Sequence, residues 1–67
     1  MQVKINGEQT EVPDSIQYVS DLTKHLGIDQ KTIVVEKNAE ILERENHGES
    51  VVSAGDSYEI VTFVGGG

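Results

Sequence analysis

The length of this chain, 67 residues, is the feature that most constrains its fold. A chain this short forms one domain, and such a domain buries only about 60% of the surface that its unfolded chain exposes. Its core is therefore thin. It has no room for a deep pocket of its own, because small-molecule sites need clefts of roughly 300–1,000 Å³. We expect a single domain over residues 1–67, and its size argues against a self-contained enzyme.

Composition narrows the class of protein and its compartment. The chain contains no cysteine, which excludes disulfides and thiolate metal sites, whereas small secreted domains commonly depend on disulfides. No apolar run approaches the roughly 20 residues of a membrane span, and residues 1–7 resemble a strand rather than the apolar core of a signal peptide. We therefore expect a cytoplasmic protein.

The net charge of −7, from 12 acidic and five basic residues, disfavours two classes of partner. Nucleic acids and anionic membranes attract basic patches. An acidic surface suits a basic protein partner and speeds encounter with it, although acidity also serves simply to keep a protein soluble. We expect a chain that binds neither nucleic acid nor membranes and is monomeric when free.

Alternation of apolar and polar residues predicts a hairpin at the start of the chain. Val3 and Ile5 alternate with polar neighbours before Asn6-Gly7, a dipeptide that tolerates the positive φ angles of a tight turn. The alternation resumes after the turn until Pro13, which cannot donate a hydrogen bond to a sheet. The predicted strands cover residues 2–6 and 8–12.

One amphipathic helix is predicted after the hairpin. Val19, Leu22 and Leu26 share one face of a helix. Gly27 fits the position just past a helix C-terminus, where a positive φ is common. At the other end, Tyr18 stands where a small capping residue is expected.

Residues rich in β-branched and aromatic side chains predict strands in the second half of the chain. Strands at both ends of the sequence, around one helix, favour an α+β fold with the helix on one face of the sheet. The predicted segments are a strand at 33–35, a short strand or turn at 41–42 that is anchored in the core, a brief pairing at 51–52 and a last strand at 58–64.

Alternation along the last strand divides its side chains between two faces. Glu59 indicates that its own face opens to solvent at one end. Phe63 on that face is either a core residue or an exposed anchor for a partner, because aromatic anchors often dominate interfaces. One face carries Tyr58, Ile60, Thr62 and Val64, and the other carries Glu59, Val61 and Phe63.

Gly65, Gly66 and Gly67 follow the last strand directly and are the most informative feature of the sequence. Glycine lacks a Cβ, so this tail is narrow and flexible, and ordering it costs entropy without filling a core. Three residues reach at most about 10 Å beyond the sheet, which is enough to enter a channel closed to larger residues. A frayed terminus or a cloning remnant is the alternative interpretation.

The α-carboxylate of Gly67 would stand at the tip of this tail without steric protection. A free carboxylate is a poor acyl electrophile, but adenylation by an ATP-using partner would make a mixed anhydride. A sulfur nucleophile could then displace AMP and leave a thiocarboxylate. Such a chain binds no cofactor itself, and its partners supply ATP binding and catalysis.

Three short motifs stand in order along the chain: Ile33-Val-Val-Glu-Lys-Asn38, the turn at Gly55-Asp56, and the ending Tyr58-Glu-Ile-Val-Thr-Phe-Val-Gly-Gly-Gly67. Together they resemble the ThiS family, the sulfur carriers of thiamin thiazole synthesis, over essentially the whole chain. The resemblance implies a β-grasp (ubiquitin-like) α+β fold, in which a mixed sheet of four to five strands packs on one main helix. It also implies that the first and last strands are parallel and adjacent.

The resemblance implies a non-enzymatic sulfur carrier with a thiocarboxylate on Gly67. It further implies three partners: a ThiF-like adenylating enzyme, a cysteine desulfurase as the sulfur source, and the thiazole synthase ThiG as the acceptor. The tail segment that partners would hold consists of Phe63, Val64, Gly65 and Gly66. Alternatives are a MoaD-like carrier for molybdopterin synthesis, a ubiquitin-like interaction module with an inert tail, and a modifier joined to target lysines.

Other polar residues do not form a recognisable catalytic or metal site. His25 and His47 are interpreted as solvated surface residues, because no Gly-x-Ser-x-Gly elbow positions a nucleophile beside them. The acidic residues of the polar segment lack the regular spacing of a calcium loop, so we interpret them as a solvated face and expect no metal. These residues are Glu40, Glu43, Glu45 and Glu49.

Overall fold

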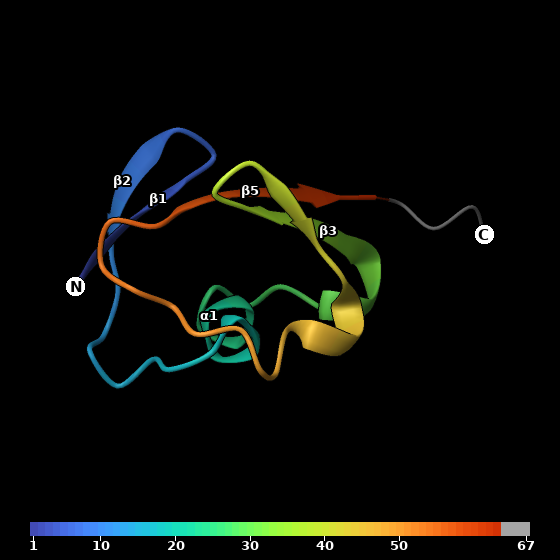
Figure 1. Ribbon diagram of the computed structural model, residues 1–67, viewed down its shortest axis with the longest axis horizontal. Helices are drawn as coiled ribbons and strands as arrows, with labels where there is room; N and C mark the ends of the chain where they lie inside the picture. The colour runs from blue at the N-terminus through green and yellow to red at the C-terminus, as the bar shows by residue number, and fades with distance from the viewer. Residues whose placement is uncertain (64–67) are drawn as a thin grey trace.

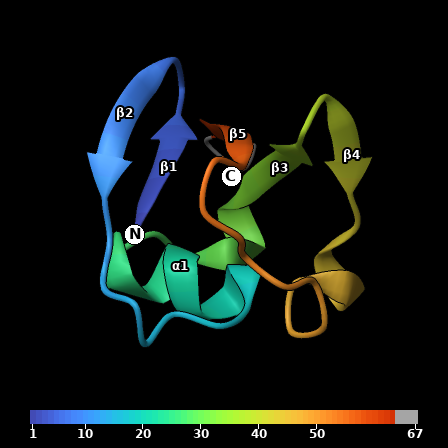
Figure 2. The ribbon, with the colours of Figure 1, turned by 60° about the vertical axis from the view of Figure 1, so that its left-hand side comes forward.

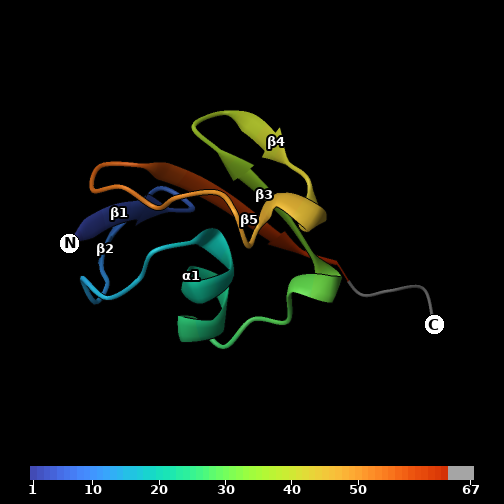
Figure 3. The same ribbon diagram turned by 60° about the horizontal axis from the view of Figure 1, so that its bottom comes forward.

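The computed structural model describes residues 1–63, in which one helix packs on one face of a five-stranded sheet (Figures 1 and 3). The predictions for Val64, Gly65, Gly66 and Gly67 lie outside these described residues. The elements are β1 (Gln2–Ile5), β2 (Glu8–Glu11), α1 (Val19–His25), β3 (Ile33–Lys37), β4 (Glu40–Leu42) and β5 (Ser57–Thr62), with short 3-10 helices at Gln30–Thr32 and Arg44–Asn46.

The order of strands across the sheet is β2-β1-β5-β3-β4 (Figure 2). β1 and β5 run parallel, whereas the other neighbouring pairs are antiparallel. The last strand of the chain therefore lies in the middle of a mixed sheet, beside the first. This topology confirms the predicted α+β β-grasp fold.

Local signals explain the hairpin and the end of the helix. Asn6 and Gly7 have φ angles of 51° and 84°, as a tight turn between twisted strands requires. Gly27 has a φ of 72°, and the next residue, Ile28, donates its N–H to the Thr23 carbonyl at 3.0 Å. This bond and the one from the Gly27 N–H to the Lys24 carbonyl at 3.1 Å satisfy carbonyls that the end of the helix leaves open, so the predicted glycine stop is confirmed.

The start of α1 is capped from inside the helix. The Tyr18 side chain makes no capping hydrogen bond. Instead, Asp21 accepts hydrogen bonds at Oδ2 from the backbone N–H of Tyr18 at 3.0 Å and of Gln17 at 3.3 Å. A carboxylate in the first turn also suits the helix dipole. Asp21, one turn later in the helix, thus compensates for the missing capping bond of Tyr18.

The core lies between α1 and the inner face of the sheet. Val51 forms an isolated bridge with Tyr18, so the predicted pairing at residues 51–52 joins the start of the helix rather than the sheet. No helix among residues 1–63 is long and apolar enough to cross a membrane. The buried apolar side chains are Val3, Val12, Ile16, Val19, Leu22, Ile33, Val35, Val52, Tyr58 and Ile60.

His47 is buried, so its interpretation as a solvated surface residue was wrong. Its exposed fraction is 1%, and its Nε2 lies 3.3 Å from the carbonyl oxygen of Leu42. The 3-10 helix at 44–46 turns the chain back after β4, and the Ser20 N–H donates to the His47 carbonyl at 3.0 Å. A histidine in a polar stretch carries no local sign of such burial. His25, by contrast, is exposed as predicted.

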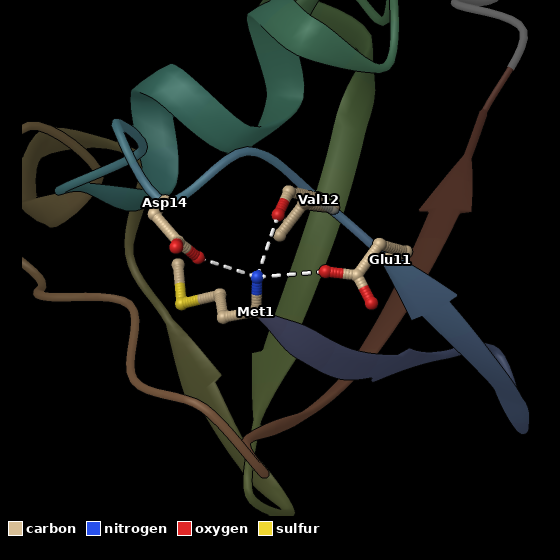
Figure 4. A network of polar contacts seen from close by, with 4 residues as sticks. All are labelled: Met1, Glu11, Val12 and Asp14. Atoms are coloured by element: carbon tan, nitrogen blue, oxygen red, sulfur yellow. Dashed lines mark hydrogen bonds and ion pairs between the residues drawn. The ribbon is translucent and has the colours of Figure 1, made fainter.

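The α-ammonium of Met1 ties the start of β1 to the segment after β2 (Figure 4). It donates to Asp14 Oδ1 at 2.6 Å, to Glu11 Oε2 at 2.8 Å and to the Val12 carbonyl at 2.9 Å. The bonds to Asp14 and then Glu11 raise the pKa of this ammonium above its ordinary value of 8.0. Its contribution to stability is therefore complete below that value and is lost as the pH rises through the raised pKa.

Candidate functional site: the end of strand β5

Strand β5 leads into the glycine tail, so its surroundings determine what a partner meets there. Its first residues are held from both sides. The Asn38 N–H donates to the Ser57 carbonyl at 2.7 Å, and the Ser57 N–H donates to the Asn38 amide oxygen at 2.9 Å. On the other side, the Lys4 N–H donates to the Asp56 carbonyl at 2.9 Å.

Asp56 and Tyr58 add a polar cluster at this first end. Asp56 Oδ2 accepts the Ser53 N–H at 2.8 Å and the Tyr58 hydroxyl at 3.0 Å, and its Oδ1 accepts the Asn38 side-chain amide at 3.2 Å. Burial alone would raise the pKa of Asp56, but these bonds outweigh it and the pKa lies below its ordinary value. Burial, together with the bond to Asp56, raises the pKa of Tyr58. The cluster fixes where β5 begins.

The far end of β5 is held on one side only. Successive residues of a strand point their backbone groups to opposite neighbours. The Phe63 N–H donates to the Thr32 carbonyl at 2.9 Å, so Val61 and Phe63 direct their backbone groups toward β3. Ile60 and Thr62 direct theirs toward β1, which pairs with β5 only as far as Ile5↔Tyr58.

The Asn6 side chain takes the place of the next β1 residue. Its amide oxygen accepts the Ile60 N–H at 2.7 Å, and its Nδ2 donates to the Ile60 carbonyl at 3.2 Å. The Asn6 backbone, with its positive φ, turns away into the hairpin. The ladder between β1 and β5 therefore ends at Ile60, and β5 continues past the hairpin (Figure 1).

The face of the sheet opposite α1 is apolar around the end of β5. Val61 is 58% exposed and Phe63 is 43% exposed, so Phe63 is not a core residue. The exposed Val34 lies directly opposite Val61 on β3. Exposed apolar residues that gather on one face commonly mark an interaction site. We call Val34, Val61 and Phe63 the outer patch.

A hollow of about 240 Å³ adjoins the outer patch, and Phe63, Ile41 and the buried His47 are among its lining residues. The exposed Ile41 extends the apolar face onto β4. The prediction that Ile41 is anchored in the core was wrong, because Ile41 lies opposite Glu36 on β3 and its side chain is 62% exposed. Val34 was not recognised as a site residue from the sequence. Strand geometry places Val34 on the opposite face from Ile33 and Val35, but its proximity to Val61 depends on the register between β3 and β5.

Two acidic residues border the outer patch. Glu36 on β3 lies directly opposite Glu59 on β5. Like charges at such positions destabilise a sheet, and within residues 1–63 the only ion pairs are the two made by the Met1 ammonium. A basic group on a partner would relieve this repulsion.

The structure describes only part of the predicted site. No group of three or more His, Cys, Asp or Glu side chains among residues 1–63 could hold a metal ion. Of the predicted site residues, the structure places Phe63 on the outer patch, where it is the last residue that the structure describes. Val64, Gly65, Gly66 and Gly67 lie outside the described residues, so their roles stay predictions.

Comparison with known proteins decides the family. The family model of the ThiS family matches residues 2–67. The chain belongs to the ThiS family. It is 32% identical over 65 residues to the sulfur carrier protein ThiS of Bacillus subtilis, covering 97% of this chain and 98% of that protein. Among solved structures, it resembles the crystal structure of the thiamine biosynthesis protein ThiS from Geobacter metallireducens, with a TM-score of 0.84, 35% identity and full coverage of both chains.

Two further similarities agree with this family. The solution structure of a thiamine biosynthesis protein from Geobacter metallireducens has a TM-score of 0.82 and 33% identity, covering all of this chain and 88% of the other. A thiazole synthase of Paramagnetospirillum magneticum is 39% identical over 67 residues. This ThiS-family chain spans only 20% of the length of that synthase.

Proposed function

We propose that this chain is a sulfur carrier protein for the synthesis of the thiamin thiazole ring, with the Gly67 carboxylate as the carrying group. One observation carries the proposal: a strand in the centre of the sheet is followed in the sequence by the exposed Phe63, then by Val64 and three consecutive glycines. A central strand gives a partner a rigid element to bind. The glycines give it a backbone that is not blocked by side chains.

The carrier step needs two changes at the Gly67 carboxyl carbon. A ThiF-like partner joins the carboxylate to the adenylyl group of ATP and releases pyrophosphate. A cysteine desulfurase supplies sulfur as the outer sulfur of a cysteine persulfide, which forms a C–S bond with the Gly67 carboxyl carbon as the C–O bond to AMP breaks and AMP leaves. A second thiol then attacks the inner sulfur of this acyl disulfide, so that a disulfide forms between the two thiol groups and the thiocarboxylate is released. The resulting thiocarboxylate is presented to a ThiG-type thiazole synthase. In this scheme the chain acts as a carrier and its partners carry out the catalysis. Because the adenylation step consumes ATP, we propose that the carrier works in the cytoplasm.

The names of the similar proteins support thiazole synthesis as the destination. One relative is named a sulfur carrier protein ThiS, and another, which contains a segment 39% identical to this chain, is named a thiazole synthase. Neither name refers to molybdopterin, so we favour the thiazole pathway over the MoaD-like alternative.

The outer patch is the contact surface that we propose for these partners. Val61 and Phe63 come shortly before the glycines in the sequence, so a partner that covers them is also positioned to bind the residues that follow. Because Glu36 and Glu59 border the patch and the net charge is −7, the matching partner surface should combine apolar residues with at least one Lys or Arg. Opposite charges would also speed encounter.

Reconstitution with and without Gly67 tests the carrier proposal. The full chain, incubated with ATP, the ThiF-like enzyme, a cysteine desulfurase, cysteine and a thiol reductant, should gain the mass difference between sulfur and oxygen. Deleting Gly67 should leave the circular dichroism spectrum unchanged and abolish this gain. An unmodified full chain, beside a known ThiS that is converted in parallel, would refute the proposal. Isopeptide-linked adducts on lysines would favour the modifier alternative.

A further inference from the structure

The backbone of Thr62 forms an open edge in an otherwise paired part of the sheet. Residues before it on β5 satisfy their β1-facing groups: Tyr58 accepts the Asn6 N–H at 2.8 Å, and Ile60 bonds twice to the Asn6 side chain. Thr62 comes next in the alternation and faces the same side. Among residues 1–63, no backbone or side-chain group donates to its carbonyl or accepts from its N–H.

The open edge at the end of β5 is confined to the side of Thr62 that faces β1. On the opposite side the pairing with β3 continues through Ile33↔Thr62, and Phe63 still donates to Thr32. The strand geometry at Thr62 is therefore fixed, while one N–H and one carbonyl point away from the sheet. Exposed strand edges of this kind pair readily with an added strand.

We propose that the Thr62 edge is a β-augmentation site, where an extended segment of the ATP-using activating partner pairs with the backbone of β5. This inference rests on the proposed carrier function. Glycines have no side chains to recognise, so a partner that guides the tail must bind it through main-chain hydrogen bonds. Thr62 is the last described residue at which such a ladder can begin, and its neighbour Phe63 belongs to the outer patch. The edge and the patch thus form one continuous docking surface.

Replacing Thr62 by proline tests the edge directly. Proline removes the N–H that faces the open side, but it leaves the hydrogen bonds to β3 in place because those come from Val61 and Phe63. Strand edges tolerate proline for this reason. Thr62→Ala is the matched control, because it removes the side chain and keeps the N–H.

Binding to the ThiF-like enzyme, measured by calorimetry, should separate the two variants. Thr62→Pro should bind about fivefold more weakly than the unaltered chain, the effect of one lost hydrogen bond, whereas Thr62→Ala should bind normally. Equal binding by Thr62→Pro would overturn the edge proposal. Sedimentation that shows a dimer of this chain lost in Thr62→Pro would also overturn it, because a second copy would then occupy the edge.

Two further measurements distinguish failure of the edge proposal from misfolding of the variant and from failure of the carrier function. If Thr62→Pro does not fold, a synthetic chain with an ester in place of the Val61–Thr62 amide removes the same N–H without the ring, and the same reduction in binding is expected. Conversion of the unaltered chain to the thiocarboxylate is measured in parallel. If that conversion occurs while both edge variants bind normally, the edge proposal fails and the carrier function stands. If it does not occur, the carrier function itself fails.

Discussion

The two ends of strand β5 are held in different ways. At the first end, Asn38, Asp56 and Tyr58 join the strand to the turn before it and to β3, and β1 pairs along the other side. At the far end, β1 has already turned away, Thr62 is paired on one side, and Phe63 stands exposed. The interactions that fix β5 are therefore concentrated away from the tail.

This difference between the two ends of β5 shows how a small domain can be stable and still present one end of a central strand to a partner. Because its core is thin, the domain cannot lose many interactions and stay folded. Anchoring β5 at its start leaves the residues before the tail free for partners at little cost in stability. Substitutions at the first end of β5 should therefore lower the free energy of unfolding, whereas substitutions at the far end should mainly weaken partner binding.

The largest effect on stability is expected at Tyr58, which is fully buried in the core. Replacing an aromatic core residue by alanine costs about 3–5 kcal/mol, a large fraction of the stability of such a domain. Urea unfolding should show Tyr58→Ala largely or wholly unfolded. Tyr58→Phe, which loses only the hydroxyl bond to Asp56, should cost about 1 kcal/mol. A stable Tyr58→Ala variant would contradict the anchoring role of the first end.

An intermediate effect is expected for Asp56→Asn, which weakens the bonds to Ser53 and Tyr58. We expect a loss of about 1–3 kcal/mol at neutral pH. The folded-state pKa of Asp56 lies below its ordinary value, so its contribution is present above that value and is lost as the pH falls through the lowered pKa.

The pH dependence supplies an internal control for Asp56. The difference in urea midpoint between the unaltered chain and Asp56→Asn should be full at pH 7 and shrink in acid below the ordinary carboxylate pKa of about 4. A difference that stays constant over this range would show that the Asp56 charge does not stabilise the first end.

The smallest effect on stability is expected at the far end, for Phe63→Ala. An exposed substitution of this kind changes the free energy of unfolding by about 0.5 kcal/mol or less. Binding to the ThiF-like enzyme should nevertheless fall by more than tenfold, as for an aromatic anchor at an interface. Val51→Ala is the matched control, because Val51 is similarly exposed but lies beside Tyr18. Equal effects of the two substitutions on binding would remove Phe63 from the docking surface.

Local chemistry made much of the fold predictable. Asn6-Gly7 marked the hairpin and Gly27 marked the end of the helix, because both turns need positive φ angles that few residues adopt. The alternation along residues 58–63 correctly divided Tyr58 and Ile60, which are buried, from Val61 and Phe63, which are exposed.

Contacts between residues far apart in the sequence could not be predicted in the same way. The Asn6 side chain reaches Ile60, 54 positions later, and nothing near either residue announces this pairing. The burial of His47 depends on how the chain returns after β4. For the candidate site, the sequence indicated Phe63, but the outer patch needed the register that brings Val34 opposite Val61.

The other predictions depend on the proposal that the Gly67 carboxylate carries sulfur. Intact-mass and top-down fragmentation spectra of the protein purified from its own cells test it most directly. We predict a fraction of the protein in which one oxygen of the Gly67 carboxylate is replaced by sulfur, within the fragment ion that contains this residue. A chain that continues past Gly67, or sulfur located on any other residue, would contradict the account.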